Sequence, residues 1–211
     1  MINSLISEMN YIKFNQQHIS PSKIVCVGRN YAEHIKELDN EVPDEPVIFI
    51  KPNSAIYNEI VFSKDDTIHY EGEITFLIIS GEIAGVGFGL DLTKREVQNR
   101  LKEKGLPWER AKAFDKSAVF SEFVEFNSDV NTLRLELYIN NKLVQSGGAD
   151  MMLHKPEALL AEIKNFLTLE DGDLIMSGTP KGVGPIRAGD SFLGKIYAGE
   201  RLLVEDSWVV K

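Results

Sequence analysis

The sequence contains almost no cysteine, no excess of basic residues and no long apolar run. A single cysteine, Cys26, cannot form an intrachain disulfide, which suits a reducing compartment. Lys and Arg number 23 against 32 Asp and Glu, and the net charge of −9 argues against a nucleic-acid partner. No apolar run approaches the ~20 residues of a membrane helix, and the first residues lack the features of a signal peptide. We therefore expect a cytoplasmic protein with no nucleic-acid or membrane partner.

Strand patterns dominate the rest of the sequence. Residues 47–50 form a short apolar run, and residues 68–79 alternate at first and then become apolar on both faces. Residues 133–139 alternate too, and Asn140-Asn141 supplies a hairpin turn because asparagine tolerates positive φ. This pattern predicts a mixed, β-rich (α+β) roll or sandwich rather than a doubly wound sheet.

Helices are predicted to be few and mostly short. Pro156 opens the one long amphipathic pattern. Shorter helices are predicted over residues 31–38, with Asn30 as the cap, and over residues 94–104, with Thr93 as the cap. No linker divides the chain, so we expect one main domain.

Two glutamates lie inside the pattern of residues 68–79. Glu71 and Glu73 point to the same face of a strand, with backbones about 6.6 Å apart, because side chains alternate along a strand. Two buried carboxylates repel each other unless a cation lies between them. Their oxygens suit Mg²⁺, with Mn²⁺ or Ca²⁺ as alternatives, and Asp91 is a third candidate ligand. By spacing alone, the pair also fits a solvated strand face, and Asp91 also fits a turn or helix cap.

Two glycine-rich segments invite nucleotide-binding interpretations that their spacing excludes. The segment S-G-T-P-K-G-V-G (177–184) lacks the G-x-x-x-x-G-K-[S/T] pattern of a phosphate-binding loop. The segment G-V-G-F-G (85–89) lacks the G-x-G-x-x-G pattern of a dinucleotide site.

Six segments together carry a resemblance to a known family: G-R-N-Y-A-E-H-I-K-E-L (28–38), F-I-K-P (49–52), H-Y-E-G-E-I (69–74), G-L-D-L-T-K-R-E-V-Q (89–98), K-G-L-P-W-E-R-A-K-A-F-D (104–115) and S-G-T-P-K-G-V-G (177–184). With these segments the sequence resembles the fumarylacetoacetate hydrolase superfamily, in its short acylpyruvase/oxaloacetate decarboxylase-like branch. The resemblance implies a β-roll or sandwich with a few short helices. Because no linker divides the chain, we expect an N-terminal arm, residues 1–20, followed by one domain, residues 21–211, which the resemblance identifies as the catalytic domain.

The resemblance also implies a set of site residues. The metal ligands would be Glu71, Glu73 and Asp91. The catalytic residues would be His34, Glu37 and Lys112. The substrate-binding residues would be Arg29, Asn30, Gln98 and Thr179, with Arg95 assigned less firmly. Three positions depart from the family pattern and bear on substrate range: Gly72, Ala149 and His154.

The implied catalytic residues have physical roles that match their chemistry. His34 and Glu37 are three residues apart and share a helix face. A carboxylate beside an imidazole orients it and raises its basicity, which suits activation of water. Lys112 would stabilise the oxygen of an enolate. Without the resemblance, the same residues would be interpreted as an exposed His/Glu pair and a solvated lysine.

The implied function is metal-dependent cleavage of a carbon–carbon bond in small 2-oxo or 2,4-dioxo acids. This includes acylpyruvate hydrolysis, oxaloacetate decarboxylation, or both, through a metal-stabilised pyruvate enolate. Two alternatives stay open. One is an isomerase or decarboxylase of aromatic degradation, of the 2-hydroxyhepta-2,4-diene-1,7-dioate isomerase type, and the other is a non-catalytic relative that binds metal and a dicarboxylate. The resemblance also suggests a homodimer.

Overall fold

The computed structural model describes residues 9–37 and 43–211. The largest sheet contains, in spatial order, β4 (Val47–Pro52), β3 (Lys23–Gly28), β14 (Leu174–Met176), β7 (Gly72–Ile79), β8 (Glu82–Asp91), β10 (Ala118–Phe120) and β5 (Ile56–Tyr57), and β11 (Val124–Glu125) also pairs with β8. The β14–β3 and β10–β5 pairs are parallel, and the other pairs in this sheet are antiparallel.

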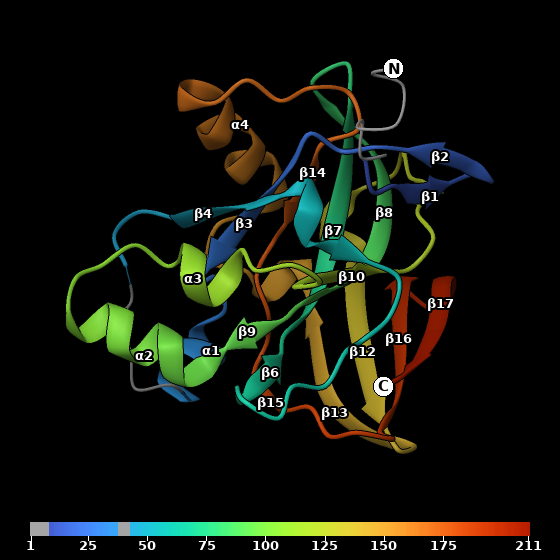
Figure 1. The fold of residues 1–211 in the computed structure, drawn as a ribbon. Coiled ribbons are helices and arrows are strands. Elements are labelled where there is room, and N and C mark those ends of the chain that lie inside the picture. The colour runs from blue at the N-terminus through green and yellow to red at the C-terminus, as the bar shows by residue number, and fades with distance from the viewer. Residues whose placement is uncertain (1–8, 38–42) are drawn as a thin grey trace, which may run out of the picture.

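A second, antiparallel sheet packs beside β7 and β8 (Figure 1). Its order is β13 (Lys142–Gly148), β12 (Leu133–Ile139), β16 (Ser191–Ala198) and β17 (Arg201–Val209). A small sheet joins β15 (Gly184–Pro185), β6 (Ile68–Tyr70) and β9 (Thr93–Lys94), and β1 (Ile12–Phe14) pairs with β2 (Gln17–Ile19). The helices are α1 (Ala32–Glu37), α2 (Arg95–Glu103), α3 (Glu109–Lys112) and α4 (Pro156–Phe166), with short 3-10 turns at Asn53–Ala55, Val130–Thr132 and Ala149–Met151. The predicted β-rich mixed fold with few helices is therefore confirmed.

The main core lies between the two larger sheets. Alternate residues of β12 are buried there, as the sequence pattern predicts, and they share one apolar cluster with β7 and β8 residues such as Phe76 and Phe88. The sheets approach so closely at Gly194 of β16 that a Cβ atom there would lie 2.5 Å from the Phe88 ring. Glycine is required at this position because any side chain would push the two sheets apart.

A second apolar cluster covers the opposite face of the large sheet. Ile12 and Phe14 of the β1–β2 hairpin pack there with Leu77 and Met176. This hairpin falls within the predicted arm, whose residues 1–8 lie outside the described residues. The division of the chain at residue 20 stays a prediction.

The predicted single strand over residues 68–79 is wrong, because it is two strands in two different sheets. The β6 strand ends at Tyr70 and β7 begins at Gly72, which leaves Glu71 at the junction. There the Glu71 carbonyl accepts a hydrogen bond of 2.9 Å from the Asp91 backbone N–H. The break therefore holds Glu71 next to the end of β8.

Both predicted helix caps are also wrong. The α2 helix begins at Arg95 after Lys94, and no side chain caps it. The Thr93 hydroxyl instead accepts a 2.7 Å hydrogen bond from Lys112 Nζ. The Asn30 amide bonds to the backbone of His154 and Ser177, far along the chain. In each case a distant partner outcompetes the local cap.

Other local predictions agree with the structure. Asn140 and Asn141 have φ of 51° and 65°, as the hairpin between β12 and β13 requires. Pro156 begins α4. Leu38, the predicted end of the first helix, lies outside the described residues. No helix within residues 9–37 and 43–211 is long and apolar enough to cross a membrane.

Candidate metal-binding active site

A narrow pocket lies where β3, β4, β7, β8, α2 and α3 meet. About 30 Å³ of it is open to the centres of water-sized molecules. Eight of the predicted site residues line it: Arg29, His34, Glu71, Glu73, Asp91, Gln98, Lys112 and Thr179. Arg95 lines it too, whereas Asn30 and Glu37 are not among the lining residues.

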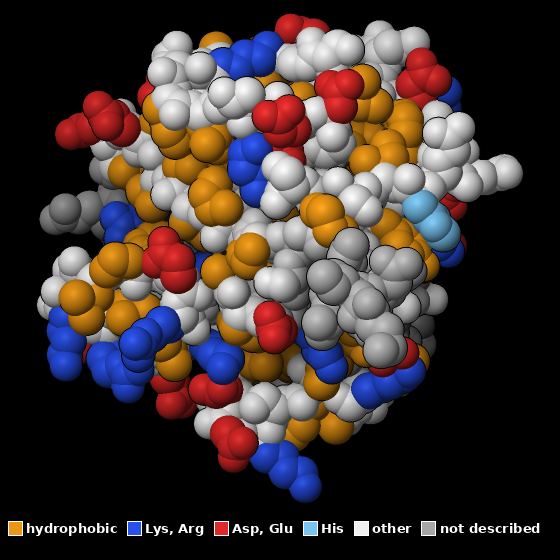
Figure 2. Space-filling model, turned by 45° about the horizontal axis from the view of Figure 1, so that its top comes forward, with side chains coloured by type: hydrophobic (Ala, Val, Ile, Leu, Met, Phe, Trp, Pro, Cys, Tyr) orange, Lys and Arg blue, Asp and Glu red, His pale blue; other side chains and the backbone are white. Residues whose placement is uncertain are grey.

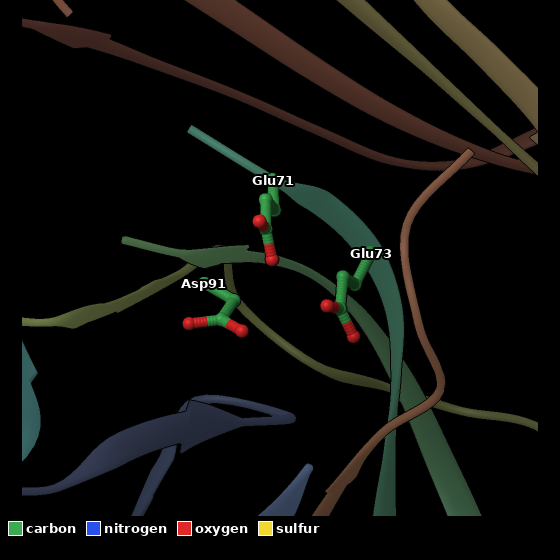
Figure 3. A group of neighbouring side chains, drawn as sticks. All are labelled: Glu71, Glu73 and Asp91. Carbon is green, nitrogen blue, oxygen red and sulfur yellow. The ribbon is translucent and has the colours of Figure 1, made fainter. Parts of the chain in front are cut away.

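Three carboxylates converge at the inner end of this pocket. Glu71 precedes β7, Glu73 lies within β7 and Asp91 ends the neighbouring strand β8. Figure 3 shows their carboxyl groups pointing toward one another, and one oxygen from each lies within 4.8 Å of the others. Their exposed fractions are only 5%, 2% and 1%, so the structure excludes the solvated strand face that the spacing alone allowed.

Lys112 joins two of the three carboxylates. Its Nζ lies 2.6 Å from Glu71 Oε2 and 2.6 Å from Asp91 Oδ2, and its side chain is 3% exposed. Burial lowers the pKa of Lys112, but Asp91 and Glu71 outweigh that effect, so the pKa is raised and the amine stays charged. The predicted site lysine is therefore buried and ion-paired rather than solvated.

Arg95 forms a second ion pair with Glu71 and presents its other nitrogen to Gln98. Its Nη2 contacts Glu71 Oε1, and its Nη1 donates a 2.6 Å hydrogen bond to Gln98 Oε1. Both side chains lie on one face of α2 because they are three residues apart. Burial raises the pKa of Glu71, but Lys112 and Arg95 together lower it far more, so this carboxylate is ionised.

Glu73 has a different environment from Glu71. Among the described residues no Lys or Arg forms an ion pair with it, and its Oε2 accepts a 2.7 Å hydrogen bond from the Gly178 backbone N–H. Burial raises the pKa of Glu73 well above its usual range, and the charges of Asp91 and Glu71 raise it further. Within residues 9–37 and 43–211, Glu73 is therefore the member of the acidic cluster that has no lysine or arginine paired with it.

His34 and Glu37 form the predicted pair on α1. His34 Nδ1 lies 3.1 Å from Glu37 Oε2, and Glu37 also accepts a 3.0 Å hydrogen bond from the Gly182 backbone N–H. Burial lowers the pKa of His34, although Glu71 and Glu37 partly offset that effect. The imidazole at the pocket wall is therefore neutral near pH 7, which is the form that accepts a proton.

Two buried polar residues at the site escaped prediction. Lys51 Nζ lies 2.9 Å from Asp91 Oδ1 and donates a 3.0 Å hydrogen bond to Ser117 Oγ. The sequence feature that could have indicated a buried, paired Lys51 is its place within β4, directly after an apolar run. Gln145 donates a 2.8 Å hydrogen bond to the Thr179 hydroxyl and accepts one of 2.9 Å from the Gly72 N–H. No local pattern marks Gln145, because its partners lie in distant segments.

Gln145 also explains why residue 72 is a glycine. A Cβ atom at Gly72 would lie 3.1 Å from Gln145 Oε1 and 3.1 Å from the Phe88 ring, closer than ordinary packing allows. The Thr179 hydroxyl donates a 2.8 Å hydrogen bond to the Gly72 carbonyl. The loop that carries Thr179 is thereby fixed to the segment between the two glutamates.

A family model described as the C-terminal part of fumarylacetoacetate (FAA) hydrolase matches residues 23–205. The chain belongs to the fumarylacetoacetate hydrolase family. Its carboxylates Glu71, Glu73 and Asp91 lie within the matched region, so the acidic cluster is part of an enzyme fold.

Individual relatives give the family likeness more detail. The chain is 43% identical over 187 residues to oxaloacetate tautomerase YcgM of Escherichia coli, a match that covers 80% of this chain and 85% of the relative. A crystal structure from Oleispira antarctica has a TM-score of 0.91 at 41% identity, covering 96% of this chain and 100% of that chain. The structure of fumarylpyruvate hydrolase from Pseudomonas aeruginosa, in complex with Mn²⁺ and pyruvate, has a TM-score of 0.87 at 29% identity and covers 99% of both chains.

The three carboxylates of this family member fit a divalent cation. All three donors are oxygens, which Mg²⁺ and Mn²⁺ prefer. Oxygens bound to one Mg²⁺ lie at most about 4.2 Å apart, since each bond is about 2.1 Å. The ligand oxygens here lie within 4.8 Å of one another, so a small inward movement of the side chains brings them to that spacing. The uncompensated position of Glu73 is also relieved by a cation. Glu71, Glu73 and Asp91 are therefore the residues that would hold the metal.

Two glutamine substitutions should separate metal binding from folding. Glu71→Gln and Glu73→Gln are each expected to weaken Mg²⁺ or Mn²⁺ binding by at least about 10- to 100-fold, the scale seen even for outer-shell partners. Without metal, Glu71→Gln should destabilise the protein because Lys112 and Arg95 lose their partner. Glu73→Gln should leave the metal-free stability unchanged or higher, because it removes a buried carboxyl group that forms no ion pair with any described lysine or arginine.

Calorimetric titration and urea unfolding with a chelator measure the two effects. The exposed Glu157 in the first turn of α4 provides the control, and Glu157→Gln should change neither. Unchanged metal affinity in both site variants would contradict the three-carboxylate site.

Proposed function

We propose that this protein is a metal-dependent tautomerase that interconverts the enol and keto forms of oxaloacetate and related small 2-oxo dicarboxylic acids. The observation that carries the proposal is the buried cluster of Glu71, Glu73, Asp91 and Lys112 beside the neutral imidazole of His34. The similarity to a curated oxaloacetate tautomerase supports the choice of substrate.

The reaction moves one proton and changes no other atoms. The enol form loses the proton of its 2-hydroxyl group and gains a proton at C3, and the reverse step returns it. His34 is the group at the pocket wall whose protonation suits this exchange, because burial keeps its pKa low and Glu37 orients the ring. We assign both proton transfers to His34: its neutral imidazole takes the proton of the 2-hydroxyl group and delivers it to C3, and in the reverse direction it takes the C3 proton and returns it to the oxygen.

Positive charge at the site favours an anionic substrate and an enolate. Lys112 and Arg95 hold fixed positions through their contacts with Glu71, so little reorganisation is needed during the reaction. The divalent cation, when bound, supplies a Lewis acid that makes hydrogens next to a carbonyl group easier to remove. Arg29, Gln98 and Thr179 line the same pocket and are proposed to position the substrate.

A second candidate is cleavage of a carbon–carbon bond, either acylpyruvate hydrolysis or oxaloacetate decarboxylation. The hydrogen-bonded His34–Glu37 pair favours it, because such a pair can take a proton from water. The likeness to fumarylpyruvate hydrolase also favours it. Both candidates use the same stabilisation of a negatively charged oxygen, so one site can support either.

The tautomerase proposal is tested by following loss of the enol absorbance of oxaloacetate above the rate in buffer alone. Wild-type protein with Mg²⁺ should accelerate the conversion, and a chelator should remove the acceleration. Lys112→Met should lower kcat by about 10²- to 10³-fold, the scale for loss of one preorganised stabilising group.

Lys142 on the β12–β13 hairpin is exposed and provides the matched lysine control. Lys142→Met should leave kcat unchanged. Pyruvate release from acylpyruvates, measured in parallel, tests the second candidate function, cleavage of a carbon–carbon bond. If metal-loaded wild-type protein does not accelerate tautomerisation, the tautomerase proposal is refuted.

A further inference from the structure

The loop of residues 177–182 contacts both groups that the proposed reaction uses. Near its start, the Gly178 N–H donates a 2.7 Å hydrogen bond to Glu73, a candidate metal ligand. At its end, the Gly182 N–H donates one of 3.0 Å to Glu37, the partner of the pocket imidazole. The position of this loop therefore affects how the acidic cluster and the imidazole lie relative to each other.

Gln145 of β13 anchors the middle of the loop. Its Nε2 donates one hydrogen bond of 2.8 Å to the Thr179 hydroxyl and another of 2.8 Å to the Pro180 carbonyl. Its Oε1 accepts one of 2.9 Å from the Gly72 N–H, so both N–H donors and the oxygen of the amide are in use.

This glutamine is an interior residue. Charged side chains are spread over the face of the molecule drawn in Figure 2, where water surrounds them, whereas Gln145 is 1% exposed. It does not line the pocket, although its partner Thr179 does. Gln145 can therefore act on a substrate only through the groups that it holds.

Three of the contacts form a closed ring. The Gly72 N–H donates to Gln145, the Gln145 amide donates to Thr179, and the Thr179 hydroxyl donates a 2.8 Å hydrogen bond to the Gly72 carbonyl. The direction of each bond is set, because a backbone N–H can only donate and the Gln145 oxygen must face it. A buried network whose members are all satisfied is rigid, so the ring fixes Thr179 against the residue between the two glutamates.

The loop is also packed directly on β13. A Cβ atom at Gly147 would lie 2.7 Å from the Cβ atom of Pro180. A methyl group at this position would have to push Pro180 and the neighbouring Thr179 away from the strand. The same strand therefore holds the loop both by packing and through the Gln145 amide.

We propose that Gln145 is a positioning residue for the reaction. It holds Thr179 in its place on the pocket wall. Through the loop of residues 177–182 it also keeps the acidic cluster correctly placed relative to the His34–Glu37 pair. This inference rests on the proposed function, since it assumes that both groups take part in one reaction.

A double-mutant cycle on an unreactive probe tests the assignment without turnover. The probe is oxalate, a stable dianion with two adjacent carboxylates, titrated calorimetrically into protein with excess Mg²⁺. Gln145→Met keeps the length of the side chain and removes its hydrogen bonds, and Thr179→Val removes the hydroxyl with little change of shape. Each should weaken oxalate binding by about 3- to 10-fold, the scale for one neutral hydrogen bond. Because Gln145 acts through Thr179, the double variant should bind no more weakly than the weaker single variant.

Two further variants distinguish positioning from a purely structural role. Ser121 is another buried hydrogen-bonding side chain, which accepts from the Phe88 N–H and does not line the pocket. Ser121→Ala should lower the stability and leave oxalate affinity unchanged. Gly147→Ala should shift the loop while every hydrogen-bonding group is retained, and it should weaken oxalate binding as Gln145→Met does.

Turnover provides a second measurement on the same variants. Gln145→Met should lower kcat for tautomerisation by about 10- to 100-fold, the scale for misplacing reacting groups by about 1 Å. Losses of oxalate affinity that multiply in the double variant, or unchanged affinity in folded Gln145→Met, would overturn the proposal. If Gln145→Met does not fold, Gly147→Ala takes its place in the cycle and the same outcomes decide. A non-additive loss of oxalate affinity in a protein that does not convert oxaloacetate supports the positioning role and counts only against the tautomerase.

Discussion

Replacing His34 with alanine is expected to lower oxaloacetate tautomerisation by about 10²- to 10⁴-fold in kcat, the typical contribution of a general acid or base. The reason is that His34 is the neutral imidazole on the pocket wall, held 3.1 Å from Glu37. Acylpyruvate hydrolysis should fall by a similar factor, because activation of water needs the same base. Oxaloacetate decarboxylation should fall by less than about tenfold, because it needs no base.

The pH dependence of wild-type turnover provides a second measurement on the same residue. Burial lowers the pKa of His34, so its basic form persists at lower pH than free imidazole, whose pKa is about 6.5. The acidic limb of the kcat/KM profile, which reports the free enzyme, should therefore lie below a pH of about 6.5, and it should vanish in the residual activity of His34→Ala.

Three comparisons complete the test. Glu37→Gln should follow the pattern of His34→Ala more mildly, since the imidazole remains. His18, an exposed histidine stacked on Tyr11, provides the control, and His18→Ala should change no activity. Equal losses in tautomerisation and decarboxylation would mean that His34 holds the substrate or closes the pocket rather than transferring a proton.

Replacing Lys51 with methionine is expected to lower the free energy of unfolding by about 3–5 kcal/mol, the scale for removing one partner of a buried ion pair. Lys51 is completely buried, and its amine contacts Asp91, Ser117 and the carbonyl oxygens of Leu92 and Lys112. All four partners lose a donor at once. Urea unfolding of metal-free protein measures the effect.

Lys164 offers a matched lysine on the surface. It forms a 3.1 Å ion pair with the exposed Glu82, and Lys164→Met should cost less than about 1 kcal/mol. Adding Asp91→Asn to Lys51→Met should recover part of the lost stability, because it removes a buried carboxylate that has lost one of its two lysine partners and shares the other, Lys112, with Glu71. A loss in Lys51→Met no larger than in Lys164→Met would show that the buried pair contributes nothing to folding.

The class of fold and the identity of the acidic residues were readable from the sequence because both depend on local information. Period-two alternation marks a strand wherever it occurs, and it predicted β12 and the turn at Asn140-Asn141. The E-x-E pattern of Glu71 and Glu73 indicated a metal site only together with the other segments that resemble the family. Bulk composition added the low cysteine content and the acidic charge.

The break at Glu71 was hidden from the sequence because it depends on which strands pair. Residues 68–79 have a nearly unbroken strand pattern, yet β6 pairs with β9 and β15 while β7 pairs with β8 and β14. The strand is interrupted because its two halves pair with different neighbouring strands. The same choice places Glu71 beside Asp91 and Lys112.

The polar contacts that fix the site are set by tertiary structure alone. Gln145 reaches Gly72 across 73 residues of sequence, and Lys51 reaches the Lys112 carbonyl across 61. Thr93 would suit a helix cap by local rules, but its hydroxyl binds Lys112 instead. The sequence by itself therefore determined which residues are chemically suited to hold a metal and an oxo acid. The tertiary structure decided which buried cations and amides surround them, because a buried charge takes the partner that the packed sheets bring within reach, whatever the distance along the chain.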